Sequence, residues 1–170
     1  MEIPKLNDQD DFLIDLQNNN YSPQTIINYA RDLSIFAVFL HFRNVPFLKV
    51  SKKDISAYKG YLISGNHIKD LQKIREEYGK NVDITRINKA EALESPSRPQ
   101  NDLGGVSTPV FESSFLSDIY RKVYGSLGMP THGSKGSDGL DPTSINRMLS
   151  ALRSFLKFRI EWDLEIPVPP

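Results

Sequence analysis

The sequence predicts an all-α domain, and two kinds of observation support this expectation. Apolar residues recur at spacings of three and four over long stretches, which places them on one side of a helix. Two of these stretches follow a strong helix-start signal, a capping side chain followed directly by proline: Ser22-Pro23 and Asp141-Pro142. We therefore expect amphipathic helices, with a long one after each of these two prolines.

The first two helices are expected in the N-terminal quarter of the chain. A short helix over 11–18 would turn Phe12, Leu13 and Leu16 to one side, and Asn18 to Asn20 should end it because Asn readily adopts turn conformations. The second helix should run from the cap at Ser22 to about Arg43. Its inward stripe would consist of Ile26, Tyr29, Ala30, Leu33, Phe36, Ala37 and Leu40. Its polar side would carry Gln24, Asn28, Arg31 and Asp32.

A third helix is expected to begin at Ser51. Asp54 lies three residues further on and completes an approximate capping box, while Val50 can pack against Ile55. The apolar face continues through Tyr58 and Leu62. Gly60 lies inside this pattern and should lower helix stability by about 1 kcal/mol relative to alanine.

The stretch 64–140 differs in character from the rest of the chain. Residues 67–78 could extend or follow the third helix, and a loop rich in Pro, Gly and Ser is expected over 94–108. An amphipathic helix is expected over 111–124, with Phe115, Leu116, Ile119 and Val123 inward. The Gly/Ser-rich stretch 125–139 should form another loop.

The last helix shows the clearest pattern. Asp141 should cap it, and its apolar stripe would consist of Ile145, Met148, Leu149, Leu152, Phe155, Leu156 and Ile160. The opposite side would carry Thr143, Asn146, Arg147, Ser150, Ser154 and Lys157. We expect Trp162 to pack against the protein, and the ending 166–170 to be extended because of its prolines.

Composition excludes several kinds of site. The chain has 170 residues, of which 39% are hydrophobic, enough for one domain with a core. Cysteine is absent, which excludes a disulfide framework, a thiolate nucleophile and a cysteine-ligated zinc site. The three histidines lack ligand spacing, so we expect no metal and no cofactor. We expect a cytoplasmic protein without membrane contact, because neither a signal peptide nor a long apolar run is evident.

Charge is balanced over the whole chain but not along it. The 21 basic residues equal the 21 acidic ones, which argues mildly against a nucleic-acid partner. However, residues 143–159 contain Arg147, Arg153, Lys157 and Arg159 and no carboxylate. Such a helix suits the anionic backbone of DNA, and backbone amides at a helix start would add to this attraction. The alternative is a solvated helix face without a partner, and Ser22 serves as a helix cap in either case.

Two segments resemble the core-binding domain of tyrosine recombinases, the family of phage integrases and Xer-type resolvases. They are 21–33 (YSPQTIINYARDL), closing on Phe36 and Phe39-Leu40, and 143–158 (TSINRMLSALRSFLKF). The resemblance implies a SAM-like, four-helix orthogonal bundle within a single domain over 1–170. The core would cover 8–63 and 141–166, with a long, partly helical insertion at 64–140. Residues 167–170 would begin a linker to a catalytic domain that is not in this chain.

The resemblance also implies a function. This domain would grip one face of an inverted-repeat half-site in double-stranded DNA, next to other recombinase protomers, with no small-molecule substrate. Contacts are expected from Ser22, Gln24, Thr25, Asn28, Arg31, Thr143, Asn146, Arg147, Ser150, Arg153, Ser154 and Lys157. The family's His-x-x-Arg element does not occur here, so this chain is not expected to be an enzyme by itself. The length of 64–140 departs from the family, whose members usually join these helices by a short connection.

Two other functions stay open at this level. One is a helical protein-interaction module, in which 64–140 forms the functional surface. The other is a non-recombinase DNA-binding regulator of the helix-turn-helix type, although no short turn joins two helices next to the basic one. Salt-sensitive binding to DNA would separate the first of these from a recombinase domain.

Overall fold

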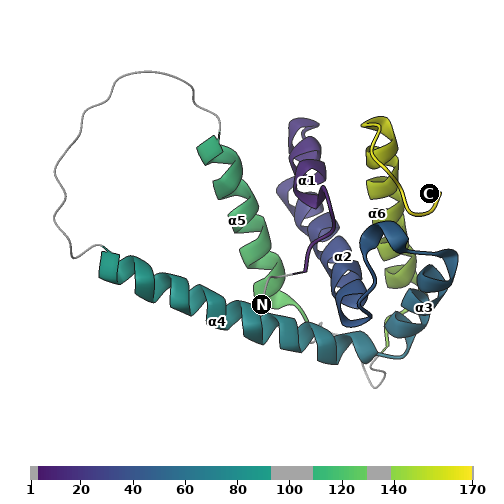
Figure 1. Cartoon of the computed structure of the whole chain (residues 1–170), viewed down its shortest axis with the longest axis horizontal. Coiled ribbons are helices and arrows are strands. Elements are labelled where there is room, and N and C mark those ends of the chain that lie inside the picture. The colour runs from purple at the N-terminus through teal and green to yellow at the C-terminus, as the bar shows by residue number, and fades with distance from the viewer. Residues whose placement is uncertain (1–3, 93–108, 130–138, 170) are drawn as a thin grey trace.

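The computed structural model describes residues 4–92, 109–129 and 139–169. Within these ranges the chain is all-helical, with six α-helices, one 3-10 helix and no strand (Figure 1). The helices are α1 (Gln9–Asn18), α2 (Pro23–Phe42), α3 (Lys52–Ile63), α4 (Asn66–Ala92), α5 (Pro109–Ser126) and α6 (Pro142–Glu161), with η1 (Phe47–Lys49) before α3. The predicted all-α class is confirmed for these residues. The loop expected over 94–108, and most of the stretch 125–139, lie outside the described residues.

Three helices begin where the capping residues predict. The Ser22 hydroxyl accepts from the Thr25 amide, and Asp141 accepts from the amides of Thr143 and Ser144. Ser51 and Asp54 form the expected reciprocal capping box. At the end of α1, Asn20 takes a left-handed conformation with φ 59°, as its residue type favours. These local predictions are confirmed.

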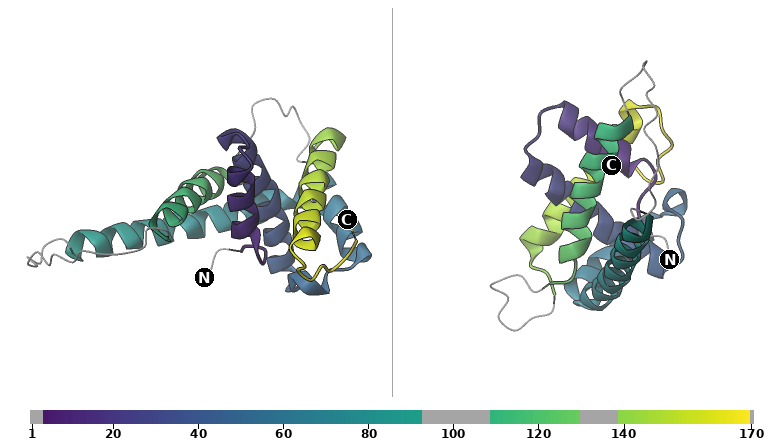
Figure 2. Two further views of the ribbon diagram at one scale, coloured as in Figure 1. Left: turned by 90° about the horizontal axis from the view of Figure 1, so that it is seen from above. Right: turned by 90° about the vertical axis from the view of Figure 1, so that its left-hand side faces the viewer.

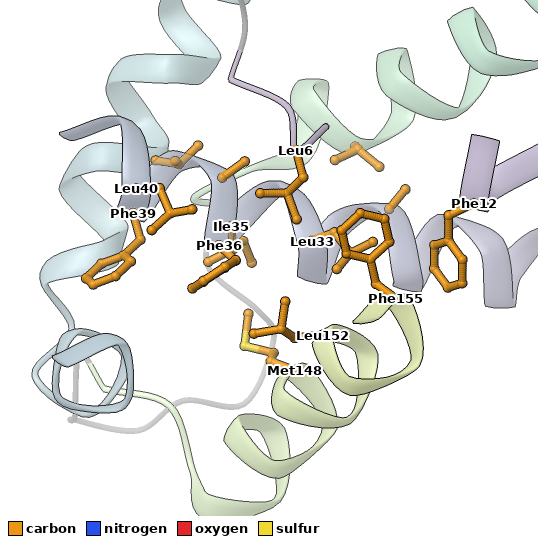
Figure 3. Close-up of a cluster of buried hydrophobic side chains, with 14 of the residues drawn as sticks. Leu6, Phe12, Leu33, Ile35, Phe36, Phe39, Leu40, Met148, Leu152 and Phe155 are labelled. Carbon is orange, nitrogen blue, oxygen red and sulfur yellow. The ribbon is translucent and has the colours of Figure 1, made fainter. Parts of the chain in front are cut away.

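Helix α2 lies at the centre of the molecule and packs against α1, α4, α5 and α6 (Figures 1 and 2). The expected inward stripe is buried apart from Tyr29, which is partly buried. Figure 3 shows Leu33 and Phe36 of α2 facing side chains of α6. However, every residue of α2 from Asp32 to Leu40 is buried, so the expectation of a polar side is wrong for Asp32. A helix with neighbours on several sides cannot keep a solvated face along its whole length.

The region 64–140 contributes two helices to the same core. Helix α4 follows α3 after a break at Gly65, which has φ 74°, so it does not extend α3. Both α4 and α5 pack on α2 and on each other. Their buried side chains include Leu71, Ile74, Ile119 and Val123, and Leu127, directly after α5, is buried as well. The expected inward residues Phe115 and Leu116 are partly buried. Residues 64–140 therefore supply part of the hydrophobic core.

The start of α6 is docked on the end of α3. The Leu140 amide donates to the Leu62 carbonyl at 3.1 Å. At Gly139, a Cβ atom would lie 1.9 Å from the Ile63 carbonyl oxygen, far inside van der Waals contact. Only glycine permits this approach, so the segment leading into α6 is held against α3 by a backbone contact.

The end of α6 differs from expectation at two residues, Arg159 and Ile160. Arg159 is buried, pairs with Asp8 and donates to the carbonyls of Asn7 and Glu165, so it does not belong to an outward basic surface. Ile160, expected in the apolar stripe, is 45% exposed. Trp162 is 62% exposed, and its ring packs against the buried Phe158 ring with 5.8 Å between the centroids. The last turn of α6 is therefore covered on the side of Phe158 and Arg159, while Ile160 lies on its uncovered side.

The C-terminal segment turns back towards the body of the protein (Figure 1). Leu164, Ile166 and Val168 are partly buried and pack against the core. In the described part of the chain, no helix combines the length and the apolar character needed to cross a membrane.

Candidate nucleic-acid interface

The candidate site is the solvent-facing side of α6. The helix buries its apolar stripe against α1, α2 and α3, which leaves its other side uncovered by those helices. We call this side the α6 outer face and define it as Thr143, Asn146, Arg147, Ser150, Arg153, Ser154 and Lys157. All of these residues are exposed except Ser154, which is half-buried. The predicted outward orientation of this set is confirmed.

The charge of the α6 outer face is positive along most of its length. Between Pro142 and Ile160 the helix contains no carboxylate. Arg153 and Lys157 are four residues apart and therefore neighbours on the helix surface. Neither forms an ion pair with any described residue. Two neighbouring cations with no partner in the described structure can bind an anionic backbone without first giving up another interaction.

The start of α6 has fewer free backbone amides for an anion than the sequence suggested. We expected backbone amides there to attract an anion, but Asp141 accepts from the amides of Thr143 and Ser144 at 2.9 and 3.0 Å. A hydrogen bond from the Ser144 hydroxyl also lowers the pKa of Asp141, which keeps this carboxylate charged. The expectation of an anion site at the helix start is wrong, because the helix's own cap occupies it.

The hydroxyl groups of the α6 outer face are partly engaged. Ser150 donates to the carbonyl of Asn146 at 2.9 Å, one turn earlier in the same helix. To donate to a phosphate, Ser150 must give up this bond, whereas its oxygen can accept without any change. The basic side chains are therefore the stronger candidates for contact with a polyanion.

The predicted residues of α2 lie around its N-terminus and are used mainly in local contacts. The Ser22 hydroxyl is 2.8 Å from that of Thr25 and caps the helix. Gln24 donates to the side chain of Asn28 at 3.2 Å. Ser22 and Gln24 are exposed, while Thr25, Asn28 and Arg31 are partly buried. The capping role of Ser22 is confirmed, and DNA contact by this set stays a prediction.

One ion pair joins the two helices that carry the predicted residues. Arg147 of the α6 outer face donates to the carboxylate of Asp32 in α2 at 2.9 Å. The Asp32 side chain is 2% exposed and that of Arg147 is 52% exposed. Burial raises the pKa of Asp32 to about 6, although the positive charges of Arg147 and Arg31 act in the opposite direction. Sequence patterns assigned Asp32 to a solvated side, so they could not indicate this pair.

A second surface feature lies away from α6. An open groove of about 540 Å³ is formed where the end of α2 meets α3 and the start of α4. Its lining residues are Phe39, Phe42, Arg43, Ala57, Gly60, Tyr61, Ser64, Asn66 and Asp70. The Arg43 guanidinium lies over the Phe39 ring, and Tyr61 donates to Asp70 at 3.1 Å. The groove combines aromatic side chains with one cation and one carboxylate, and sequence reasoning did not predict it.

Among the described side chains, no group of three or more potential ligands is placed to hold a metal ion.

Comparison with protein-family models, with curated proteins and with solved structures finds no match to this chain. The features that bear on function are therefore the α6 outer face and the residues around it.

Proposed function

We propose that this chain is a DNA-binding domain of the core-binding type found in tyrosine recombinases. The observation that carries the proposal is the orientation of α6: its carboxylate-free side faces solvent, with Arg153 and Lys157 exposed. Had this side been turned into the core, the charge pattern would have had no physical connection to a polyanion.

The proposed interaction is mainly electrostatic. Lysine and arginine side chains that neutralise phosphates release condensed counterions, which favours binding and makes it sensitive to salt. Arg147, Arg153 and Lys157 would contact phosphates, while Asn146 and the hydroxyl groups would add hydrogen bonds that fix the register. A role at one face of an inverted-repeat half-site, beside other protomers, follows from the family resemblance of 21–33 and 143–158.

The proposal extends to the fold. A SAM-like orthogonal bundle would be formed by α1, α2, α3 and α6, with α4 and α5 as an addition within 64–140. In this proposal the chain binds DNA in the cytoplasm but does not cut it, because the family's His-x-x-Arg element does not occur in its sequence. Strand cleavage would require a catalytic domain joined after residue 167.

The test is binding to a short mixed-sequence DNA duplex, measured by fluorescence anisotropy over a series of salt concentrations. We expect weak binding to the wild-type chain that falls steeply as salt rises. The double variant Arg153→Ala/Lys157→Ala should bind less tightly, and its log–log salt slope should decrease by about 2, since each phosphate that is no longer neutralised accounts for about 0.9. A double variant on other exposed surfaces, Lys69→Ala/Lys122→Ala, removes the same charge and should behave like the wild type.

Two outcomes would contradict the proposal. One is the absence of salt-sensitive retention of DNA by the wild-type chain. The other is an equal decrease of affinity in both double variants, which would show that net charge matters and the α6 outer face does not.

The groove between α2, α3 and α4 supports a second candidate, a helical protein-interaction module. Its aromatic lining and open shape are typical of surfaces that receive a side chain from another protein. Under this alternative, substitutions on α6 would leave the binding of a partner protein unchanged. Ala57→Arg, which fills the groove, would abolish that binding.

A further inference from the structure

We propose that Asp32 is a positioning residue for polyanion binding, which holds the Arg147 guanidinium in a fixed place on the α6 outer face. This inference rests on the proposed function. It assigns a role to a buried residue that would not itself touch DNA.

The two partners of the pair differ in burial: Asp32 is buried and Arg147 is exposed. Asp32 lies within the buried part of α2, so its carboxylate is held by the packing of the central helix. Arg147 reaches it with one nitrogen at 2.9 Å, while about half of the arginine side chain stays exposed. A guanidinium has five N–H donors, so donors remain for a phosphate after this bond is made. A long side chain that is already ordered loses less freedom when it binds.

Arg159 shows what a purely structural arginine looks like in the same helix. It also pairs with an aspartate, Asp8, but its side chain is 4% exposed and its other donors bind the carbonyls of Asn7 and Glu165. Arg147 makes no such additional bonds to the described residues, and its position is open to solvent. The Asp32–Arg147 pair therefore leaves arginine donors accessible from solvent, which the Asp8–Arg159 pair does not.

The surroundings of Asp32 make it dependent on Arg147. Arg31 lies close enough to influence the carboxylate but forms no ion pair with it in the described structure. The buried hydroxyl of Tyr58, which the Asp32 charge also influences, has no hydrogen-bond partner among the described atoms. Burial alone would favour the neutral form of Asp32, as its raised pKa shows. The charged form is therefore stabilised chiefly by the one arginine that faces solvent.

The test compares the contribution of Arg147 to DNA binding in two backgrounds that both lack a charge at position 32. The Asp32→Asn background keeps an oxygen that can accept from Arg147, and the Asp32→Ala background has none. We measure the dissociation constant for duplex DNA with and without Arg147→Ala in each. Position 32 carries no carboxylate in either background, so removal of Arg147 leaves no unpaired charge there. The difference between the two effects of Arg147→Ala on the dissociation constant therefore reports the hydrogen bond and not the charge.

We expect Arg147→Ala to weaken binding about tenfold in the Asp32→Asn background and about twofold in the Asp32→Ala background, a coupling within the range seen for contacting residues. Circular dichroism checks that each variant is folded. If Asp32→Ala does not fold, Asp32→Leu replaces it, since leucine has a similar branched shape and no acceptor.

Two results would overturn the inference in different ways. Equal effects of Arg147→Ala in both backgrounds, with DNA binding intact, would remove the positioning role and leave the proposed function standing. Failure of the wild-type chain itself to bind DNA would remove both.

Discussion

Asp32→Asn offers a quantitative test of the burial at the centre of the fold. The carboxylate has a pKa of about 6 in the folded chain, against an ordinary value of 3.8, because burial disfavours its charge. Each pH unit between these values corresponds to about 1.4 kcal/mol, so the full effect is about 3 kcal/mol. Solvent does not screen this value strongly, since the Asp32 side chain is 2% exposed.

The sign follows from which state binds the proton more tightly. The pKa of Asp32 is higher in the folded state, so its protonation stabilises the fold. This stabilisation is fully present below pH 3.8 and is lost as the pH rises to about 6. Asparagine does not titrate, so the variant lacks this dependence. We therefore expect the unfolding free energy of Asp32→Asn, minus that of the wild type, to increase by about 2.4 kcal/mol between pH 4 and pH 7, because a small part of the effect has already developed at pH 4.

The assay is urea unfolding of both proteins across this pH range, followed by circular dichroism. Subtraction removes the contributions of other carboxylates, such as Asp54 and Asp141, whose pKa values are lowered and whose effects have the opposite sign. A difference that is flat with pH, or that decreases as pH rises, would refute the raised pKa of Asp32 in the folded chain.

Three further predictions concern stability and are checked by thermal or urea unfolding. Gly139→Ala should destabilise the fold by about 1–3 kcal/mol, because its Cβ would collide with a backbone carbonyl, whereas Gly60→Ala, with open space around it, should be neutral or stabilising. Equal effects would contradict the docking of α6 on α3. Arg159→Met should cost about 2–4 kcal/mol, because the Asn7 and Glu165 carbonyls and the Asp8 carboxylate lose their common donor. An unchanged melting temperature would show that this arginine does not link the two ends of the chain. Ser22→Ala should lower stability by about 1 kcal/mol because the α2 cap is removed, and Gln24→Ala, which keeps the cap, should have a smaller effect.

Local signals in the sequence determined where helices begin and which residues form their main apolar stripes. The caps at Ser22, Ser51 and Asp141 predicted three helix starts, because a capping side chain satisfies amides only two or three residues away. The same holds for the outward orientation of the α6 outer face, since one apolar stripe on a helix implies a polar side opposite to it. Such interactions depend on neighbours along the chain, and the sequence contains them directly.

Only the tertiary structure decided how much of each helix is buried and which charges meet. Asp32 and Arg147 are far apart in the sequence, and nothing in their local patterns indicates that α2 is surrounded and α6 lies beside it. Arg159 follows Phe155 by four residues and Leu156 by three, so its spacing places it on the apolar side of α6, but only the tertiary structure shows that Asp8, near the other end of the chain, is its partner. Burial and long-range pairing depend on how whole helices pack, and a pattern that repeats every few residues carries no information about that packing.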